Sequence, residues 1–456
     1  MRFVLRGLTG ARALHPPDAV MPLRIVIAVQ HFPPGFTGGV EIYSEWIAKA
    51  LGRAGHDVLV VALEDMFRPA GAPIEVRESD HAPGVRVLRL SMLDEQFWTF
   101  EASVLHRPLK DWFAALLREV DPDIVHIQGG YRLSAAPLIA ARAHARARVV
   151  VTLHDYWYAC PTVNLLDAAD RPCSGAVAPE TCVRCTQAIH TANLRGAEDW
   201  MARTDLAYHA AMTARSALMR RVLAGVDLVL SPTDHLAETY LGAGFRFPNL
   251  RIVRLGLDPS LAAPRRNTGA MPAVPTIGFI GTLLYHKGAH VLAEAVTTLH
   301  ASGIPVRCVI YGATDSPSDY VTRLLGRYVD HPAITFGGGY PIGRLTAILQ
   351  DIDAVAVPSL WAENSPLVAL SALANATPVI ASDIGAMKEF VRPEVNGLLC
   401  VPGSATSLAE AIESVCIDVG MLRGLAQGAR YDRTSAEEAD DLTSIYQQLM
   451  LAPRRA

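Results

Sequence analysis

The sequence lacks three features that define large classes of proteins: a surplus of positive charge, a long apolar run and an even spread of cysteines. Its 41 basic and 45 acidic residues give a net charge of −4, so we expect no nucleic acid partner. No apolar run reaches the roughly 18 residues that a membrane-spanning helix needs. The seven cysteines do not form a disulfide-like pattern, which favours a cytoplasmic protein.

The chain also lacks a convincing signal peptide at its start. Residues 1–20 contain two early arginines, short apolar runs and a Pro pair, and the better organised sequence begins at Met21. We expect these 20 residues to be disordered or to reflect a wrongly chosen start. The 456 residues, half of them apolar, are too many for one core and predict two domains.

Short runs rich in Val and Ile alternate with longer stretches rich in Ala, Leu and Arg. The predicted strands are 24–29, 57–63, 85–90, 123–128, 148–154 and 227–233, then 276–283, 306–312, 334–339, 353–359, 378–383 and 397–403. Continuous apolar strands separated by helices indicate parallel sheets that are covered on both faces. A Pro-rich stretch at 258–275 predicts a linker between the first six and the last six of these strands.

These patterns predict an α/β protein of two Rossmann-like, doubly wound parallel-sheet domains that face a central cleft. We expect domains at 21–260 and 275–430, and a C-terminal helix at 431–456 that packs back toward the first domain. Ligands bind such sheets at the carboxyl ends of the strands, beside helix N-termini.

Several polar or glycine-containing motifs follow predicted strands. Gly38 and Gly39 precede a helix after the first strand, Lys287 lies in the loop after the strand at 276–283, and His154 follows the strand at 148–154. Glycine amides and a lysine near a helix N-terminus suit an anion such as a diphosphate. Each motif also has a plain structural explanation: a glycine turn, a solvated lysine or a histidine that only completes the core.

The segment "SLWAENSPLVALSALANATPVIASD" places Glu363 just before a predicted helix that Ser365 can cap, with Pro366 as its first residue. The helix dipole favours the ionised carboxylate there by about 0.5 kcal/mol. Ser371 falls in the second turn of the same helix. The alternative is that Glu363 merely supports the helix cap.

Two Asp-x-Asp patterns, at 121–123 and 351–353, match the metal-binding motif of some sugar transferases. Both precede their predicted strands, which places them at the amino end of the sheet, away from the cleft. We therefore interpret them as turn residues.

Taken together, the motifs resemble those of retaining glycosyltransferases of the GT-B fold, specifically glycosyltransferase family 4. The resemblance extends from Met21 to the C-terminus and is strongest over residues 361–383, where the family pattern is Glu, seven residues, Glu, with Pro-Leu-Val inside. "GTLLYHKG", "GGVE", "HD", "TPVIASDIGAMKEFV" and "NGLLCVPG" match further family segments in the right order.

The resemblance implies a role for each matching position, without a cofactor for catalysis. Glu363, His154 and Lys287 would be catalytic: Lys287 on the diphosphate, Glu363 on the donor sugar hydroxyls and His154 at the sugar or the acceptor side. The residues that would bind the donor are Gly38, Gly39, Thr282, Lys287, Gly288, Tyr340, Ile342, Glu363, Ser365, Pro366, Leu367, Val368 and Ser371.

Two positions depart from the family pattern. Thr282 stands where the family usually has an arginine, which leaves Lys287 as the expected cation on the diphosphate. Ser371 replaces the second glutamate, which in the family binds the ribose hydroxyls, and a serine cannot accept two hydrogen bonds bidentately. We therefore expect a sugar-nucleotide site whose nucleoside half is altered, with His286 as one candidate substitute.

An insert after His154 contains Cys160, Cys173, Cys182 and Cys185. The Cys-x-x-Cys pair has the spacing of zinc ligands, and four thiolates would complete a tetrahedral structural site. The insert is rich in Pro and Ala and has no core of its own, so a metal would help most there. Reduced thiols are the alternative.

The implied function is transfer of a hexose-type sugar from a nucleotide-diphosphate sugar to a glycan or lipid-linked acceptor, in bacterial surface polysaccharide or lipopolysaccharide synthesis. An aromatic group near Phe97, Trp98 and Phe100 could add peripheral contact with the inner face of the membrane. Arginines among apolar residues could do the same, or could form a solvated face of a sheet-covering helix: Arg195, Arg203, Arg215, Arg220 and Arg221.

Two other functions remain open from the residues, and a third is weighed against them. The chain could be a weakened homologue that only binds sugars, or a sugar-nucleotide epimerase of the same architecture. A nicotinamide-dependent dehydrogenase is disfavoured, because the Gly-x-Gly-x-x-Gly fingerprint is absent after the first strand of either domain.

Overall fold

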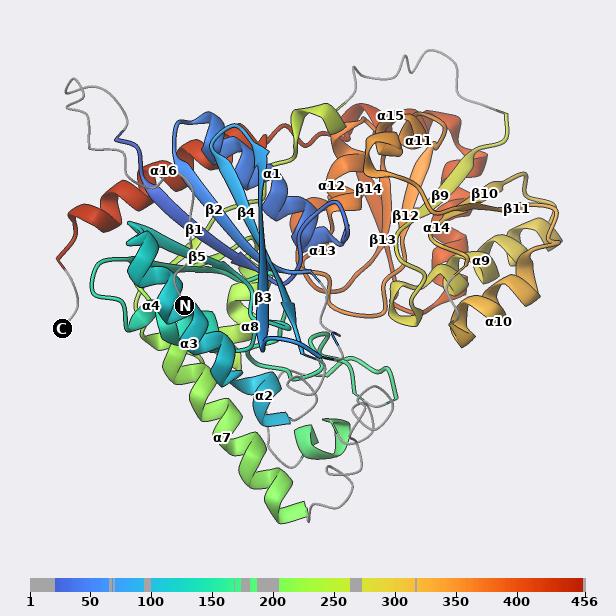
Figure 1. Ribbon diagram of the computed structural model, residues 1–456. Helices are drawn as coiled ribbons and strands as arrows, with labels where there is room; N and C mark the ends of the chain where they lie inside the picture. The colour runs from blue at the N-terminus through green and yellow to red at the C-terminus, as the bar shows by residue number, and fades with distance from the viewer. Residues whose placement is uncertain are drawn as a thin grey trace.

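The computed structural model describes residues 21–64, 68, 70–93, 100–167, 169–173, 181–186, 205–262, 273–315 and 318–453. The N-terminal extension lies outside these ranges, as does most of the expected linker. Figure 1 shows two α/β lobes side by side, one for each half of the chain, with the last helix returning to the first lobe.

The first lobe is built on an eight-stranded sheet of order β3-β4-β2-β1-β5-β6-β7-β8. The strands are β1 (Arg24–Val29), β2 (Asp57–Leu63), β3 (Ile74–Ala82), β4 (Val85–Met92), β5 (Ile124–Gln128), β6 (Arg148–Thr152), β7 (Leu228–Ser231) and β8 (Leu250–Ile252). The helices are α1 (Gly39–Arg53), α2 (Phe100–Val104), α3 (Arg107–Val120), α4 (Ala136–Arg142), α7 (Asp205–Ala224) and α8 (Asp234–Gly242). Every strand pair is parallel except β3 with β4.

The second lobe is built on a six-stranded, wholly parallel sheet of order β11-β10-β9-β12-β13-β14. The strands are β9 (Thr276–Ile280), β10 (Arg307–Tyr311), β11 (Ile334–Gly338), β12 (Ala354–Val357), β13 (Val379–Ser382) and β14 (Gly397–Cys400). The α-helices are α9 (Ala289–Ala301), α10 (Asp319–Tyr328), α11 (Leu345–Gln350), α12 (Leu367–Ala374), α13 (Met387–Phe390), α14 (Ala405–Ile417) and α15 (Val419–Gly428). Short 3-10 turns are η2 (Pro259–Leu261), η3 (Tyr285–Lys287) and η4 (Ile342–Arg344).

Both faces of the first sheet are buried at its central strands, which explains why those strands are apolar without alternation. In β1, Val26 and Ala28 belong to the core beneath α3, α4 and α7, whereas Ile25 and Ile27 belong to the core beneath α1. Each of the 12 predicted strands coincides with or overlaps an observed strand. The two strands that the pattern did not predict are β3, a charged antiparallel edge strand, and the three-residue β8.

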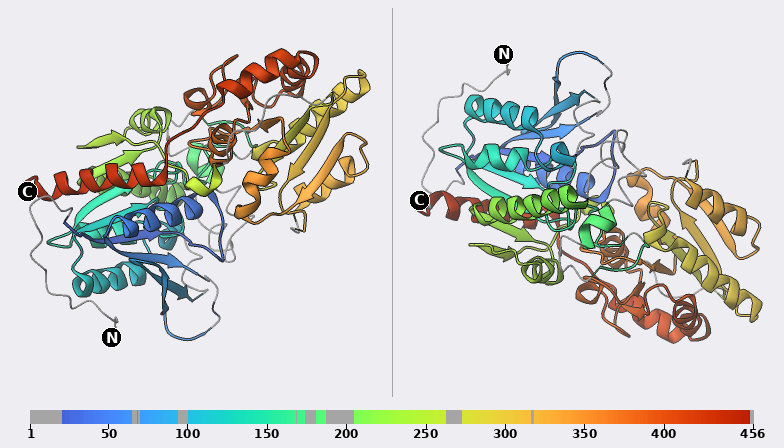
Figure 2. Two further views of the ribbon diagram at one scale, coloured as in Figure 1. Left: turned by 90° about the horizontal axis from the view of Figure 1, so that it is seen from above. Right: turned by 90° about the horizontal axis from the view of Figure 1, so that it is seen from below.

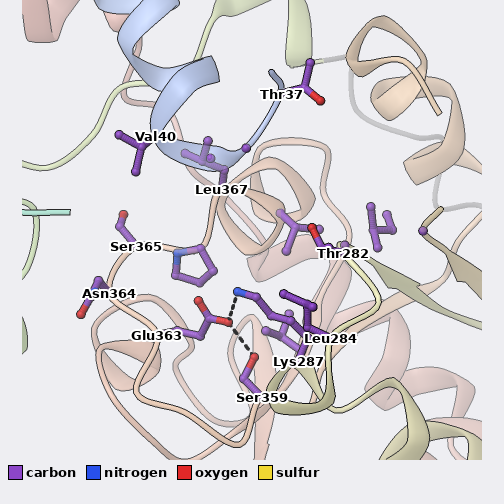
Figure 3. Close-up of a pocket in the computed structure, with 18 of the residues that line it drawn as sticks. Thr37, Val40, Thr282, Leu284, Lys287, Ser359, Glu363, Asn364, Ser365 and Leu367 are labelled. Atoms are coloured by element: carbon purple, nitrogen blue, oxygen red, sulfur yellow. Dashed lines mark hydrogen bonds and ion pairs between the residues drawn. The ribbon is translucent and has the colours of Figure 1, made fainter. Parts of the chain in front are cut away.

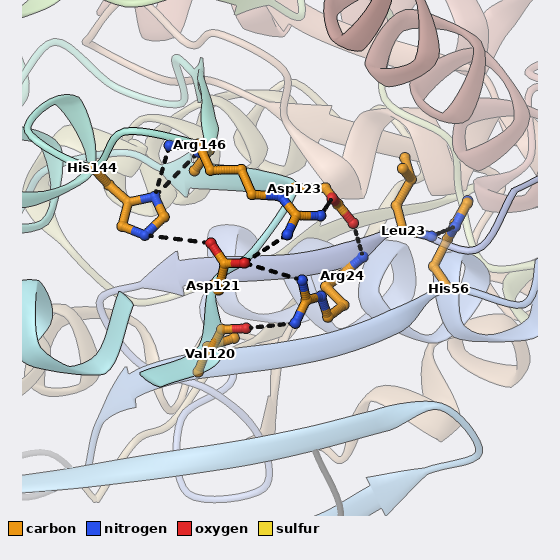
Figure 4. Close-up of polar contacts among 9 residues, drawn as sticks. Leu23, Arg24, His56, Val120, Asp121, Asp123, His144 and Arg146 are labelled. Carbon is orange, nitrogen blue, oxygen red and sulfur yellow. Dashed lines mark hydrogen bonds and ion pairs between the residues drawn. The ribbon is translucent and has the colours of Figure 1, made fainter. Parts of the chain in front are cut away.

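The Asp-x-Asp residues lie at the amino ends of their strands, as expected. Asp123 accepts hydrogen bonds from the Arg24 amide at 2.9 Å and from Arg146 at 2.6 Å, and Asp121 accepts from Arg146 at 2.6 Å (Figure 4). On the second sheet, Asp353 accepts from the Thr276 amide at 2.8 Å. These aspartates join neighbouring strands and play no part in the cleft.

Helix α16 (Ser435–Leu451) crosses back from the second lobe and packs along α1 (Figure 2). The buried carboxyl group of Glu438 links α16 to α1 and to the loop after β8. Glu438 accepts a hydrogen bond from the Tyr43 hydroxyl at 2.8 Å and from the Gly256 amide at 2.6 Å. Burial raises the pKa of Glu438 to about 7, although both hydrogen bonds oppose the rise.

This raised pKa predicts a pH-dependent stability. A carboxyl group whose pKa rises on folding contributes stability that is complete below its ordinary pKa and is lost as the pH rises through about 7. Glu438→Gln removes the titration, so between about pH 5 and pH 8 the free energy of unfolding should shift in favour of the variant by up to about 3 kcal/mol. Urea denaturation of both proteins across this range measures the shift, and parallel pH profiles would contradict it.

Candidate active site

A pocket of about 650 Å³ lies between the lobes, at the carboxyl ends of both sheets. Its walls come from loops that follow β1, β6, β7 and β8 on one side and β9, β10, β11 and β12 on the other. The first residues of α1 and α12 face each other across it, with Val40 and Leu367 close together in Figure 3. This is the position at which doubly wound sheets bind ligands.

The central polar feature of the pocket is an ion pair between Lys287 and Glu363. The Lys287 Nζ atom lies 2.7 Å from Glu363 Oε1. The Ser359 hydroxyl and the Trp361 indole N–H donate to the same oxygen, each at 2.7 Å (Figure 3 shows the first of these). Three donors therefore hold Oε1, while no hydrogen bond from the described residues is recorded for Oε2, which remains available to a ligand.

The ion pair keeps Glu363 charged although its side chain is only 6% exposed. Burial alone would raise the pKa of Glu363, but the charge and the hydrogen bond of Lys287, with the Ser359 and Trp361 hydrogen bonds, lower it overall. The ammonium group of Lys287 also lies 4.7 Å from the centroid of the Trp361 ring, which adds a cation–π contact.

Two glycines allow the backbone segments behind this ion pair to approach each other. Gly288 has φ of 77°, and a Cβ atom there would lie 1.9 Å from the Pro358 carbonyl oxygen. Gly385 has φ of 63°, and a Cβ atom there would lie within 2.7 Å of backbone atoms of Glu363. A side chain at either position would push the Lys287 loop or the Glu363 loop out of place.

The start of α12 differs from the prediction. Pro366 is the N-cap residue rather than the first helical residue, and the Ser365 side chain makes no capping hydrogen bond. Its hydroxyl is buried and has no hydrogen-bond partner among the described residues. Because proline has no N–H, the free donors at this helix end are the amides of Leu367 and Val368, which line the pocket.

The first lobe contributes His154 and Asp155 to the opposite wall. His154 Nε2 lies 2.7 Å from Gln128 Oε1, and burial lowers the pKa of the imidazole to about 3, so the ring is neutral. Burial raises the pKa of Asp155 to about 6, opposed by the Trp157 amide and assisted by Glu41. This wall therefore offers hydrogen-bonding groups without a fixed positive charge.

The structure brings most, but not all, of the predicted site residues to this pocket. The predicted residues that line it are Gly38, Gly39, His154, Thr282, Lys287, Tyr340, Glu363, Ser365, Pro366, Leu367 and Val368. Gly288, Ile342 and Ser371 are not among its lining residues. Ser371 is fully buried in α12, and its hydroxyl has no hydrogen-bond partner in the described part of the chain.

Sequence reasoning missed several residues that hold this site together. Ser359 and Trp361 bind Glu363 directly, while Tyr156 and Asn364 make hydrogen bonds between the lobes. Proximity to Glu363 in the sequence was the available signal for Ser359, Trp361 and Asn364. Nothing in the sequence connects Tyr156 with residues more than 200 positions away.

The four cysteines of the insert line one small cavity of about 30 Å³. Burial, and to a smaller extent the neighbouring cysteines, raises the pKa of the Cys185 thiol to about 12. Within the ranges that the structure describes, however, no three His, Cys, Asp or Glu side chains are arranged to hold a metal ion. The four cysteines therefore share one cavity but do not form a ligand set as they stand.

Of the residues that we predicted to face the membrane, four lie outside the described ranges: Phe97, Trp98, Arg195 and Arg203. Arg215 is buried and donates to the Trp157 and Tyr158 carbonyl groups, so it is not part of an exposed basic face. None of the helices in the described portion of the chain is both long and apolar enough to cross a membrane.

Comparison with protein families identifies two matching segments. Residues 38–256 match the glycosyl transferase 4-like domain, and residues 265–431 match the glycosyl transferases group 1 domain. The chain is 26% identical over 439 residues to a glycogen synthase of Mycobacterium tuberculosis, with 95% of each chain covered. It is also 26% identical to a D-inositol 3-phosphate glycosyltransferase of Rhodococcus erythropolis, which covers 94% of this chain and 91% of the relative.

Solved structures share the fold at lower identity. Sucrose-phosphate synthase from Thermosynechococcus elongatus superposes with a TM-score of 0.69 at 21% identity, over 94% of this chain and 100% of the other. Anabaena Alr3699/HepE, solved in complex with UDP and glucose, gives a TM-score of 0.64 at 17% identity, over 93% and 100% of the two chains. The two-lobed architecture is therefore the GT-B fold, as predicted.

The buried ion pair predicts a specific pattern of stability in variants. Lys287→Met leaves the Glu363 carboxylate buried without its counter-charge, which should lower the free energy of unfolding at neutral pH by roughly 3–5 kcal/mol. Adding Glu363→Gln should restore much of that loss, because the buried charge is then gone. Urea denaturation of the single and double variants measures the coupling.

Lys388→Met is the matched control. It breaks an exposed pair with Asp383, whose side chains are 64% and 40% exposed, and should cost at most about 1 kcal/mol. Strictly additive effects of Lys287→Met and Glu363→Gln would show that the pair is not coupled in solution.

Proposed function

The chain belongs to the glycosyl transferases group 1 family, whose members are retaining EC 2.4 enzymes that use nucleotide-sugar donors, and on this premise we propose that the pocket between the lobes is its transfer site. The donor is a nucleotide-diphosphate hexose held by the second lobe, and the acceptor is a hydroxyl group of a glycan or lipid-linked glycan on the first lobe. The observation that carries the proposal is the Lys287–Glu363 pair beside the free amides of α12.

The diphosphate of the donor would bind between Lys287 and the start of α12. Among the described residues that line the pocket, Lys287 is the single Lys or Arg side chain. The unpaired amides of Leu367 and Val368 add two donors at the positive end of the helix dipole. Thr282, also in the lining, can add a hydroxyl hydrogen bond but no charge.

The sugar would lie against Glu363, whose Oε2 atom can accept from two hydroxyl groups. The acceptor hydroxyl then attacks the anomeric carbon from the face that the diphosphate leaves. The C–O bond to the diphosphate breaks, the new glycosidic bond forms, and the acceptor proton passes to the departing phosphate oxygen. Lys287 and the α12 amides stabilise the negative charge that grows there. Neutral His154, on the opposite wall, orients a hydroxyl group by hydrogen bonding.

The nucleoside would occupy the end of the pocket formed by apolar residues and by Tyr340. The acidic side chains in the described lining are Glu363 and Asp155, and Ser371 does not reach the pocket. The ribose would therefore be held without a carboxylate. Names of relatives support a UDP- or ADP-type donor: one solved neighbour was crystallised with UDP-glucose, and another, a starch synthase, with ADP.

We also propose bacterial surface polysaccharide synthesis as the pathway, and the inner face of the cytoplasmic membrane as the site of action. The support is the family alone, whose relatives here include enzymes named for a polysaccharide and for an inositol phosphate. Residues 21–260 would bind the acceptor and residues 275–430 the donor, in keeping with the positions of His154 and Lys287.

The donor assignment is tested by binding. In calorimetric titrations with UDP, GDP and ADP, one diphosphate should bind the wild-type protein, and Lys287→Ala should weaken that binding at least about 100-fold. Lys388→Ala, which removes a lysine outside the pocket lining, should bind as wild type does. Equal affinities for wild type and Lys287→Ala would overturn the phosphate assignment.

The role of Glu363 is tested by catalysis. Glu363→Gln keeps the size of the side chain but loses the charge, so it should retain nucleotide binding and lose about 100-fold or more in kcat. The assay follows release of the nucleoside diphosphate with and without an acceptor. Full activity of Glu363→Gln would remove its sugar-binding role. Nucleotide binding by the wild type without any turnover would instead favour a homologue that only binds sugars.

We finally propose that Cys160, Cys173, Cys182 and Cys185 together hold a structural zinc ion. The support is that all four line one cavity. They do not form a ligand set as they stand, so the metal would have to draw them together. Elemental analysis of purified protein should find about one zinc per chain, and Cys182→Ser combined with Cys185→Ser should lose it. A zinc-free protein of unchanged melting temperature would exclude the site.

A further inference from the structure

Two hydrogen bonds beside the pocket join the lobes in opposite directions. The Tyr156 hydroxyl, from the loop after β6, donates to the Ala362 carbonyl oxygen at 3.1 Å. The Asn364 side-chain amide, from the loop before α12, donates to the His154 carbonyl oxygen at 3.1 Å. Each lobe therefore binds the backbone of the other at or next to a site residue: Ala362 directly precedes Glu363, and the second acceptor belongs to His154.

The orientation of the Asn364 side chain follows from this contact. A carbonyl oxygen can only accept, so the group that faces His154 must be the NH₂ group of the amide. Asn364 is 3% exposed, which leaves little room for another arrangement. The bond is a directional constraint on the Glu363 loop and not an incidental surface contact.

Trp361 extends the contact to the ion pair. The Tyr156 ring meets the Trp361 ring edge-on, with centroids 6.5 Å apart and planes at 87°. Trp361 and Ala362 both pack against the hydrophobic core of the first lobe, although they belong to the second. The same indole donates to Glu363 Oε1 and lies beneath Lys287. Contact with the first lobe thus fixes a side chain that touches both members of the ion pair.

A separate contact joins the lobes elsewhere. Glu389, in α13, accepts hydrogen bonds from the amides of Asp234 and His235 at the start of α8, and it forms an ion pair with Arg254. Since none of these four residues lines the pocket, this contact holds the lobes together without aligning the site. Loss of the Tyr156 bond therefore leaves another tie between the lobes in place.

We propose that Tyr156 and Asn364 are positioning residues for the transfer step: their reciprocal hydrogen bonds, through Trp361, hold Glu363 and Lys287 in register with His154 across the cleft. This inference rests on the proposed function. It predicts that the two bonds act on the alignment of acceptor and donor and not on the affinity for the nucleotide, because their hydrogen bonds go to the Ala362 and His154 carbonyl groups and not to Lys287 or the α12 amides.

The test compares nucleotide binding with turnover in the variant Tyr156→Phe, which removes one oxygen atom and keeps the ring. Its kcat for transfer should fall about 10- to 100-fold, since small displacements of reacting groups have effects of this size. The dissociation constant of the nucleoside diphosphate should stay within about threefold of wild type. The ratio of donor hydrolysis to transfer should rise, because a misaligned acceptor lets water compete.

Tyr328→Phe is the matched control. It removes a hydroxyl group from a buried tyrosine of α10, outside the pocket, and should leave all three quantities unchanged. Asn364→Ala is the second variant and should reproduce the Tyr156→Phe pattern. The double variant should lose far less than the product of the two single losses, because both bonds serve one alignment.

Three outcomes would overturn the inference: wild-type kcat in both single variants, a loss of nucleotide affinity that accounts for the whole effect, or fully multiplicative losses. Failure of the proposed function is distinguishable, because then the wild-type protein itself would show neither nucleotide binding nor turnover.

Discussion

The site depends on one buried ion pair, Lys287 with Glu363. A carboxylate that is almost fully buried keeps its charge only because an ammonium group, a hydroxyl group and an indole N–H bind the same oxygen atom. That arrangement turns the second oxygen toward the pocket and holds the lysine beside the free end of α12. Without the pair, the second lobe would present neither a fixed acceptor for sugar hydroxyls nor a fixed cation for a diphosphate.

The fold supplies the surroundings that the pair needs. Parallel strands end at the same edge of each sheet, so the loops after β9 and β12 deliver Lys287 and Glu363 to the same place. Close backbone contacts at Gly288 and Gly385 fix those loops from behind. The first lobe contributes the neutral His154 and the protonatable Asp155. Helix α16, which follows the second lobe in the chain, packs on α1 and so ties the two lobes together.

The sequence predicted the parts of this arrangement that depend on local pattern. Apolar runs gave the parallel strands, and the rule that ligands bind at strand ends then singled out His154, Lys287 and Glu363. It did not predict β3, because a charged edge strand lacks the apolar signal, nor the actual cap of α12 at Pro366. Ser371 shares a helix with the site but faces the core, which only the packing reveals. Contacts between the lobes, such as that of Tyr156 with Ala362, join residues 206 positions apart and leave no mark in a local pattern.

A crystal structure with the bound nucleotide sugar tests the central claim most directly. We predict that the diphosphate lies within hydrogen-bonding distance of Lys287 Nζ and of the Leu367 and Val368 amides, with the hexose hydroxyl groups at Glu363 Oε2. A donor bound elsewhere in the cleft, with Lys287 and Glu363 still paired and making no contact with it, would contradict the account.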